Sequence, residues 1–375
     1  MNSYTTDDLL VLAKRHHNTK RSYLLVNPLQ AKHLPADPDS SLEMMAALGR
    51  RLAEAYPYAK LVIGFAETAT AIGAAVAACM GEGCKYIHTT REACPEGAGL
   101  ISFNEEHSHA VEQTLVADHL AEWIAQTEQI IFVDDEISTG KTLLNVIAQL
   151  RAAFPEAENK EIVAASVISR LSPQNEERFA QAGVKSECLL KLDNEDLTER
   201  VAPFDISEAL PPCAGAKSAS AEIMHVRQPL RNPRLGVDAR DYAASCRLQA
   251  EELIGRLPAG KHVLVLGTEE CMYPALVLAQ CLRGSDVVCH ATTRSPIGLC
   301  TDPAYPIRSG FRLHSFYDGE RTTYIYNLRS YDLAIVYTDT PNDDARARAD
   351  IAAALGESGC PKVIFIEGGQ YVQQL

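Results

Sequence analysis

A run of polar side chains follows an apolar segment near the middle of the chain. The sequence IIFVDDEISTGKT places four apolar residues before Asp134 and Asp135 and then continues into a stretch of hydroxyl residues and glycine. Two neighbouring carboxylates can accept hydrogen bonds from two hydroxyls of a ribose, and hydroxyls and amides at a helix start can surround a phosphate. The segment therefore predicts a ribose-phosphate site whose phosphate is held by Ser138, Thr139, Gly140, Lys141 and Thr142.

Two other interpretations of this segment fail. The letters TGKT end the nucleotide P-loop, but that motif needs a glycine five places before Gly140, where Asp135 stands. The acidic pair would also repel the oxygens of a triphosphate unless a metal intervened. A purely structural interpretation, in which Asp135 caps a helix and Gly140 marks its start, does not account for so many polar side chains at one strand end.

The elements that would position this segment alternate along the chain. Short Val- and Ile-rich runs separated by helical patterns indicate an α/β fold with a mainly parallel sheet. Ligands of such sheets bind outside the carboxyl ends of the strands. We expect strands over 60–65, 85–88, 129–133, 161–168 and 184–190, with helices over 67–80, 116–128, 139–153 and 174–182.

The second half of the chain resembles the first. Strands are expected over 261–267, 285–293, 332–337 and 362–367, and Thr-Thr-Arg occurs at both 89–91 and 292–294. The segment equivalent to the acidic pair contains Tyr337, Thr338 and Asp339, so the pair is lost there. We expect two Rossmann-like domains, the second a degenerate copy, with residues 1–210 and 241–375 joined by a Pro-rich linker over 211–240.

Composition limits the function. The chain has 375 residues and a formal charge of −14, which argues against nucleic-acid binding because that requires clustered Lys and Arg. The 11 cysteines contain no CxxC pair, so neither a zinc site nor a disulfide framework is indicated. The N-terminus has no signal-peptide pattern and no run is long and apolar enough for a membrane span, so we expect a cytoplasmic protein.

The acidic pair followed by the hydroxyl- and glycine-rich loop resembles the 5-phosphoribosyl-1-pyrophosphate (PRPP) motif of the type I phosphoribosyltransferases. The resemblance implies transfer of phosphoribose from PRPP to a nitrogen base, with Mg²⁺ held by Asp134 and Asp135 directly or through PRPP and water. In that family the acidic pair holds the ribose hydroxyls and the loop holds the 5-phosphate. Ser138 stands where hypoxanthine-guanine enzymes carry an Asp, which argues against ordinary 6-oxopurine salvage.

The same resemblance assigns further residues. Arg91, beside Thr90, matches a cationic diphosphate contact, and residues 92–110 match a catalytic lid in which Glu105 or His107 would act, with Glu106 and His109 nearby. A solvated acidic turn is the alternative for this cluster. Residues 26–38 would form the hood over the base, with Lys32 and His33 as candidates. The diphosphate loop would be the turn Ala66, Glu67, Thr68, Ala69 and Thr70.

Glu67 departs from the family pattern, because a carboxylate beside a diphosphate is repulsive. It would either act through Mg²⁺, which prefers oxygen ligands, or simply begin the helix. Both interpretations remain open from the sequence.

The whole chain resembles phosphoribosyltransferase-like proteins with a C-terminal TRSP domain, which occur in tellurium-resistance and stress-response gene clusters. The resemblance implies synthesis of a nucleoside-like metabolite, with a homodimer and partner enzymes of the same cluster as candidates. A PRPP-binding regulator and a nucleotide- or nucleoside-cleaving enzyme are the alternatives. The second domain would either pack against the first or bind another ligand through Thr292, Thr293, Arg294 and Ser295.

Overall fold

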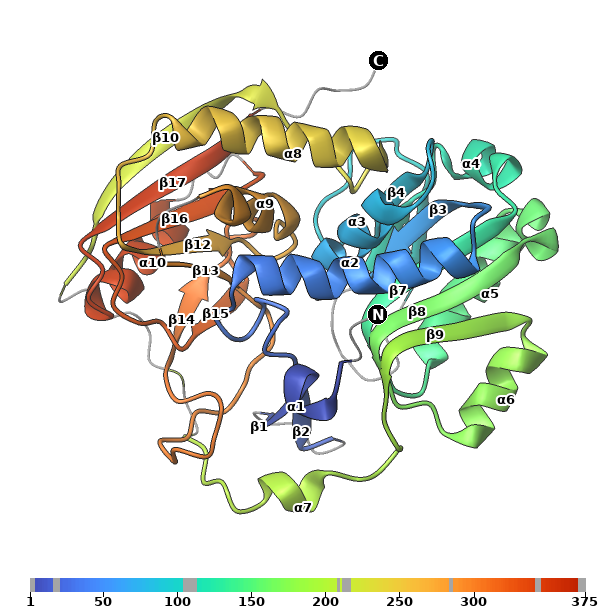
Figure 1. The fold of residues 1–375 in the computed structure, drawn as a ribbon, viewed down its shortest axis with the longest axis horizontal. Coiled ribbons are helices and arrows are strands. Elements are labelled where there is room, and N and C mark those ends of the chain that lie inside the picture. The colour runs from blue at the N-terminus through green and yellow to red at the C-terminus, as the bar shows by residue number, and fades with distance from the viewer. Residues whose placement is uncertain are drawn as a thin grey trace.

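Two parallel sheets form the framework of the protein. The computed structural model describes residues 4–15, 21–103, 113–207, 210, 217–282, 286–340 and 345–369. All strands of the first sheet except one short edge strand come from the first half of the chain, and all strands of the second sheet come from the second half (Figure 1).

The first sheet has the order β11-β4-β3-β7-β8-β9, and all its neighbours are parallel except the short β11. In the register of the sheet, Gly64 pairs with both His88 and Val133. The turns that follow these three strands therefore leave the sheet at the same edge. The expected strands are confirmed as β3 (Ala59–Gly64), β4 (Lys85–His88), β7 (Gln129–Ile137), β8 (Glu161–Ser169) and β9 (Val184–Lys191).

Helices connect these strands and begin where the sequence supplies caps. Asp37 precedes Pro38 and accepts a hydrogen bond of 2.8 Å from the amide of Ser40, and Ser172 caps the helix that begins at Pro173. The helices of this half are α2 (Pro38–Ala55), α3 (Thr70–Cys79), α4 (Leu120–Gln126), α5 (Lys141–Ala153), the 3₁₀ turn Pro155–Asn159, α6 (Pro173–Gln181) and α7 (Thr198–Val201).

The second sheet has the order β10-β17-β16-β12-β13, and every pair is parallel. Its four strands β13, β12, β16 and β17 follow one another across the sheet as β4, β3, β7 and β8 do in the first. The two halves therefore share the order of four parallel strands. The elements are β12 (His262–Gly267), β13 (Asp286–Ala291), β16 (Leu333–Thr338), β17 (Lys362–Gly369), α8 (Ala239–Ile254), α9 (Tyr273–Cys281) and α10 (Ala345–Glu357).

The expected linker over 211–240 needs correction. Its residues 220–229 form β10 (Ser220–Pro229), the edge strand that pairs with β17, and β11 (Val237–Asp238) pairs with β4 of the first sheet. The alternation of β10 is weak because Met224 and Val226 are its buried side chains and the others are exposed. Such a mostly polar edge strand resembles a linker in sequence.

The two halves are packed closely together. Helices α2, α3, α8 and α9 lie between the sheets and contact one another, and one hydrophobic core contains residues of both halves (Figure 1). Edge segments are also exchanged: Ala36 forms a bridge with Cys289 of β13, while Val237 pairs with Tyr86 of β4. The interface is therefore part of the fold rather than a loose contact between domains.

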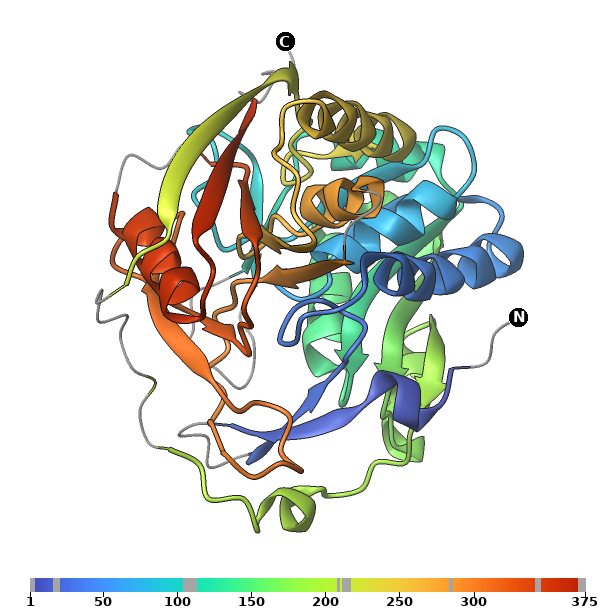
Figure 2. The ribbon, with the colours of Figure 1, turned by 60° about the vertical axis from the view of Figure 1, so that its left-hand side comes forward.

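Three hairpins complete the molecule. The first, β1 (Val11–Lys14) and β2 (Tyr23–Val26), follows α1 (Thr6–Leu9), lies below the two sheets in Figure 2 and bridges to the second half between Arg15 and Ile297. The others are β5 (Leu100–Phe103) with β6 (Gln113–Val116), and β14 (Gly310–His314) with β15 (Thr322–Tyr326). In the described ranges, no helix is both long and apolar enough to cross a membrane.

Candidate functional site

A cleft of about 400 Å³ lies at the edge where β3, β4 and β7 end. The N-terminal hairpin and the first sheet contribute to its walls, as does the segment of residues 293–296 in the second half, which is called the TRSP segment after its sequence. The lining residues are Arg15, Arg21, Leu24, Leu25, His33, Phe65, Ala66, Glu67, Thr68, Arg91, Gln113, Asp134, Asp135, Glu136, Ser138, Thr142, Arg294, Ser295 and Pro296.

The acidic pair lies in this cleft at the end of β7. Asp134 and Asp135 are both partly exposed, and the amide of Asp135 donates a hydrogen bond of 2.9 Å to Oδ1 of Asp134. The hydroxyl of Thr68 donates to Oδ1 of Asp135 at 2.8 Å. The turn after β3 and the end of β7, which are more than sixty residues apart in the sequence, are thus in direct contact at the predicted site.

The turn after β7 has a conformation that requires glycine. Gly140 has a φ of 69°, and a Cβ at this position would lie 2.2 Å from Cε2 of Phe179. Helix α5 begins immediately afterwards at Lys141, so its N-terminus faces the turn. Ser138 and Thr142 line the cleft, whereas Thr139 and Gly140 of the turn and Lys141, the first residue of α5, do not.

The turn after β3 supplies a second wall. Ala66, Glu67 and Thr68 line the cleft, but Ala69 and Thr70 are buried behind it. The hydroxyl of Thr70 donates to the carbonyl oxygen of Glu270 at 2.9 Å. Helix α3 begins at Thr70 rather than at the expected Glu67, because these residues form the turn instead of the first helical turn.

Glu67 is held by cations. Lys32, which is fully buried, places Nζ 2.6 Å from Oε1 of Glu67, and Arg294 places Nε 3.3 Å from Oε2. Burial alone would raise the pKa of Glu67, but the charges of Lys32 and Arg294 outweigh burial and lower the pKa. The expectation that Glu67 begins the helix is wrong, and its carboxylate instead forms the contact between the two halves.

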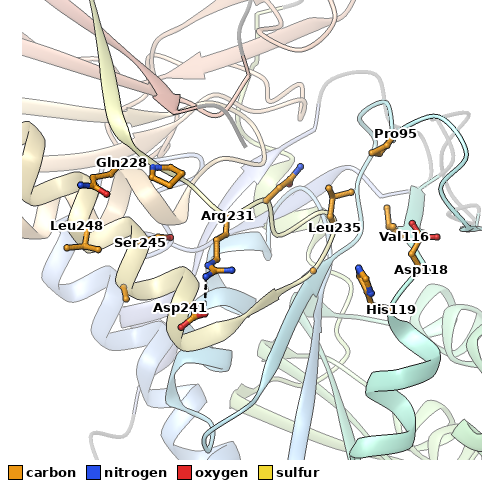
Figure 3. A pocket seen from close by; sticks show the side chains of 14 residues that line it. Pro95, Val116, Asp118, His119, Gln228, Arg231, Leu235, Asp241, Ser245 and Leu248 are labelled. Carbon is orange, nitrogen blue, oxygen red and sulfur yellow. Dashed lines mark ion pairs between the residues drawn. The ribbon is translucent and has the colours of Figure 1, made fainter. Parts of the chain in front are cut away.

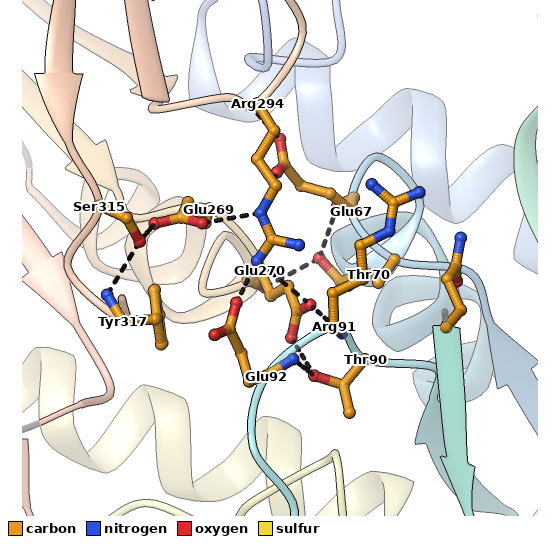
Figure 4. A network of polar contacts seen from close by, with 12 residues as sticks. Glu67, Thr70, Thr90, Arg91, Glu92, Glu269, Glu270, Arg294, Ser315 and Tyr317 are labelled. Carbon is orange, nitrogen blue, oxygen red and sulfur yellow. Dashed lines mark hydrogen bonds and ion pairs between the residues drawn. The ribbon is translucent and has the colours of Figure 1, made fainter. Parts of the chain in front are cut away.

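Arg294 joins the two halves through a cluster of carboxylates (Figure 4). Its guanidinium lies 2.8 Å from Oε2 of Glu269, and it also pairs with Glu92 and Glu270. Arg321 contributes a second cation, 2.8 Å from Oε1 of Glu92. Burial alone would lower the pKa of Arg294, but these carboxylates and Glu67 raise it, so the side chain is positively charged.

Glu92 and Glu270 show opposite effects of this environment. Burial raises the pKa of Glu92 to about 7, and the neighbouring charge of Glu270 acts in the same direction. Burial also acts to raise the pKa of Glu270, but Arg234, His88, Arg294 and the amide of Arg91 together outweigh it and lower the pKa to about 2. The carboxylate of Glu270 is therefore the ionised partner of the pair.

The two halves contact each other reciprocally. The amide of Arg294 donates to Oε1 of Glu67 at 3.2 Å, and the amide of Arg91 donates to Oε1 of Glu270 at 3.1 Å. Glu67 and Glu270 are equivalent in the two copies, as are Arg91 and Arg294. This exchange places Thr292, Thr293, Arg294 and Ser295 at the interface, and it brings Arg294 and Ser295 into the cleft of the first half.

The equivalent region of the second half is filled by its own side chains. Asp339 lies 2.6 Å from the guanidinium of Arg234 and accepts a hydrogen bond from the hydroxyl of Tyr317. Ser315 donates to Glu269 at 2.5 Å. These contacts occupy the positions that the acidic pair and its cleft have in the first half.

Several residues of the cleft were missed by the sequence predictions. Arg15, Arg21, Leu24 and Leu25 come from the N-terminal hairpin, which the sequence did not predict as a wall of the site. Arg21 also pairs with Glu136 at 2.8 Å. Of the two expected hood candidates, His33 lines the cleft and Lys32 is buried at the interface.

Part of the expected lid cannot be placed. Residues 104–112 lie outside the described residues, and Glu105, Glu106, His107 and His109 fall within them. The described arms β5 and β6 form an antiparallel hairpin after β4, and Gln113 at the start of β6 lines the cleft. Within the described ranges, no group of three or more His, Cys, Asp or Glu side chains could hold a metal, and the ten cysteines found there form no disulfide with one another.

Another cavity, of about 650 Å³, lies beside α8 (Figure 3). Its walls come from the ends of the β5–β6 hairpin, residues 228–236 and helix α8, with an ion pair of 3.1 Å between Arg231 and Asp241 at its side. None of the predicted site residues lines it, so the chemistry indicated by the sequence belongs to the cleft.

Comparison with protein families decides the assignment. Residues 9–194 match a family described as phosphoribosyl transferase, and residues 231–355 match the TRSP domain that follows this transferase domain. The chain belongs to the phosphoribosyltransferases that carry a TRSP domain. The first half is thus the transferase domain of a glycosyltransferase-class enzyme, and the second half is its TRSP domain.

Solved structures of phosphoribosyltransferases are similar at low identity. An adenine phosphoribosyltransferase from Giardia lamblia, in complex with 9-deazaadenine, is 17% identical over 51% of this chain and 98% of its own, with a TM-score of 0.38. The enzyme from Trypanosoma brucei, with AMP, pyrophosphate and ribose-5-phosphate, is 14% identical over 50% and 79%, with a TM-score of 0.34. A comparison with curated proteins found no match.

Proposed function

We propose that this protein transfers phosphoribose from PRPP to a nitrogen base and releases pyrophosphate. The observation that carries the proposal is that Asp134, Asp135, Ser138 and Thr142 line one cleft together with the turn after β3. Asp134 and Asp135 would accept hydrogen bonds from the ribose hydroxyls. Ser138 and Thr142 would donate to the 5-phosphate at the N-terminus of α5, where the helix dipole favours an anion.

The chain supplies positioning and charge rather than a nucleophile. The base nitrogen forms the new bond to the anomeric carbon while the bond from that carbon to the pyrophosphate oxygen breaks, and the bonding electrons leave with pyrophosphate. Arg91 lines the cleft and would place positive charge near the leaving group. Holding the base and PRPP together in a cleft removes much of the entropic barrier to their reaction.

Mg²⁺ is the proposed cofactor. Carboxylate oxygens are ligands that Mg²⁺ prefers, and it is commonly bound by one or two carboxylates together with phosphate oxygens and water. Asp134 and Asp135 are partly exposed in the cleft and fit this requirement. The ion would neutralise charge on the diphosphate when bound.

The acceptor is a base other than an ordinary 6-oxopurine in this proposal, because Ser138 stands where an Asp would contact that ring. The product would be a nucleoside-like metabolite. The test is to incubate the protein with PRPP, Mg²⁺ and a panel of bases and to measure pyrophosphate. We expect release that depends on PRPP, on Mg²⁺ and on one class of base.

The control for this assay is the same mixture with each component left out in turn. If PRPP raises the unfolding temperature but no base produces pyrophosphate, a PRPP-binding regulator is the better description. If PRPP neither stabilises the protein nor reacts, the proposed function is wrong.

A further inference from the structure

We propose that the TRSP domain is a working part of the PRPP site, and that Arg294 is a positioning residue that acts through Glu67. This inference rests on the proposed function and assigns the TRSP segment a role in it. Arg294 lies on the second half of the chain, but its side chain lines the cleft of the first half. It would hold the turn of residues 65–70 in the state that accepts the diphosphate.

The need for such a residue comes from Glu67. Glu67 is 7% exposed and lies on the turn that lines the cleft beside Thr68. A carboxylate in this position repels a diphosphate unless its charge is compensated, and the repulsion is stronger away from bulk water. Lys32 and Arg294 provide this compensation at 2.6 Å and 3.3 Å.

The contacts of Lys32 are not confined to Glu67. Its ammonium group has three protons, and it contacts three oxygens: Oε1 of Glu67 at 2.6 Å, the carbonyl of Glu269 at 2.9 Å and the carbonyl of Thr292 at 3.0 Å. Lys32 therefore fixes the main chain of the second half as well as Glu67. It is also one charge in a cluster where Glu269, Glu270 and Glu92 lie close to Arg294.

Arg294 fixes the position of the Glu67 carboxylate in addition to compensating its charge. Its amide and its guanidinium both contact Glu67, at 3.2 Å to Oε1 and 3.3 Å to Oε2. The carboxylate is thus held from the backbone and the side chain of one residue. Movement of the TRSP segment would move Glu67 and with it the turn that carries Thr68, whose hydroxyl reaches Asp135.

The second half holds its equivalent glutamate, Glu270, in a similar way. Glu270 is held there by the amide of Arg91 at 3.1 Å and by Arg234 at 2.8 Å. In that half Tyr317 and Arg234 contact Asp339, which follows β16 where the acidic pair follows the apolar part of β7. Both copies therefore hold the equivalent glutamate through a main-chain amide and a guanidinium. In the first half, which retains the acidic pair, this glutamate lines the cleft.

The experiment compares Arg294→Gln with Arg308→Gln, an exposed arginine of the same half that lies outside the cleft. Calorimetry measures the Kd of PRPP with Mg²⁺, and circular dichroism confirms folding. We expect Arg294→Gln to raise the Kd at least about tenfold, as for truncation of one partner of a buried charge pair, and Arg308→Gln to leave it unchanged. In turnover, the loss should appear in KM for PRPP rather than in kcat.

A double variant separates positioning from direct contact. If Arg294 acts through Glu67, Glu67→Gln in the Arg294→Gln background removes the uncompensated charge and should recover binding. No recovery would overturn the proposal. Arg294→Lys keeps the charge, so it should bind PRPP better than Arg294→Gln; equally weak binding would also contradict it. The Glu67→Gln, Arg294→Gln variant serves as the binding test if Arg294→Gln does not fold.

The wild-type protein serves as the control that separates failure of this inference from failure of the proposed function. A wild-type protein that fails to bind PRPP contradicts the proposed function. A wild-type protein that binds PRPP, together with an Arg294→Gln variant that binds it equally well, contradicts the role of Arg294 and leaves the proposed function standing.

Discussion

The hydroxyl of Thr68 donates a hydrogen bond of 2.8 Å to Oδ1 of Asp135. This bond connects the turn after β3 to the end of β7, so the proposed diphosphate and ribose contacts are fixed relative to each other. Thr68→Val removes the donor while keeping the shape. We expect PRPP to bind several-fold more weakly, in line with the roughly 1 kcal/mol that such a bond contributes.

Thr68→Ser is the matched control because it retains the hydroxyl. Calorimetric titration of both variants with PRPP and Mg²⁺ gives the comparison. Equal affinity of Thr68→Val and wild type would show that the contact between the two turns has no part in binding.

Replacing Gly140 by alanine should lower both the stability of the protein and its affinity for PRPP. At a φ of 69° an added Cβ would lie 2.2 Å from Phe179, so Gly140→Ala forces the turn or the ring to move. We expect a loss of about 1 to 3 kcal/mol in the free energy of unfolding, together with weaker PRPP binding. Urea unfolding measures the first quantity.

Gly81→Ala is the control for that experiment, because no atom lies within 4 Å of its added Cβ. It should be neutral to within about 1 kcal/mol, the usual range for an exposed site. A Gly140→Ala variant as stable as Gly81→Ala would mean that the turn is not held as the structure shows.

Much of the core of the fold could be predicted, because β3, β7, β8, β12 and β16 are continuous apolar runs that become buried strands. Asp134 and Asp135 could be placed for the same reason, since a predictable strand leads to them. The N-terminal hairpin could not, because each strand has four residues and gives little periodicity.

The reciprocal contacts depend on how the two halves pack. Nothing local in the sequence pairs Glu67 with Arg294 or Glu270 with Arg91, because each pair joins residues separated by about two hundred positions. The repeat of Thr-Thr-Arg in both halves was the available signal. It identified related segments, but the exchange between them follows from the packing of α2, α3, α8 and α9.

Arg234 and Arg231 allow the cost of breaking a buried ion pair to be compared with that of breaking an exposed one. Arg234 is 7% exposed and pairs with Glu270 at 2.8 Å and Asp339 at 2.6 Å, whereas the pair of Arg231 with Asp241 is exposed. Arg234→Gln leaves two buried carboxylates without their main cation, so we expect a loss of about 3 to 5 kcal/mol. Arg231→Gln should cost under about 1 kcal/mol.

Chemical unfolding of the two variants distinguishes these costs. Similar losses for Arg234→Gln and Arg231→Gln would contradict the burial of the two ion pairs of Arg234.

Stability should fall as the pH is lowered from 6.5 towards 4. Burial lowers the pKa of His33, His88 and His290 to about 4 from 6.5, so the unfolded chain binds more protons than the folded protein in this range. The stability that these neutral histidines contribute is fully present above pH 6.5. It is lost as the pH falls from 6.5 towards 4, because the unfolded chain takes up protons that the folded protein does not. For each histidine, the free energy of unfolding should fall by up to about 2 kcal/mol between pH 6.5 and 5.

Glu92 has the opposite effect on the pH dependence of stability. Its pKa is raised to about 7, so the folded protein binds this proton more tightly than the unfolded chain and gains stability as the pH falls. The three histidines outweigh this single carboxyl. Urea unfolding at pH 7.5 and pH 5 should show a smaller difference for His290→Gln than for wild type. An unchanged difference would mean that His290 does not remain neutral in the folded protein.

The proposal that PRPP binds at the acidic pair of the transferase domain is tested most directly by its Kd in Asp134→Asn, Asp135→Asn. A control variant, Asp193→Asn with Glu199→Gln, removes two carboxylates at exposed positions outside the cleft. We predict saturable binding of PRPP with Mg²⁺ to wild type and to the control, and no detectable binding to the acidic-pair variant. Unchanged affinity of the acidic-pair variant would contradict the assigned site.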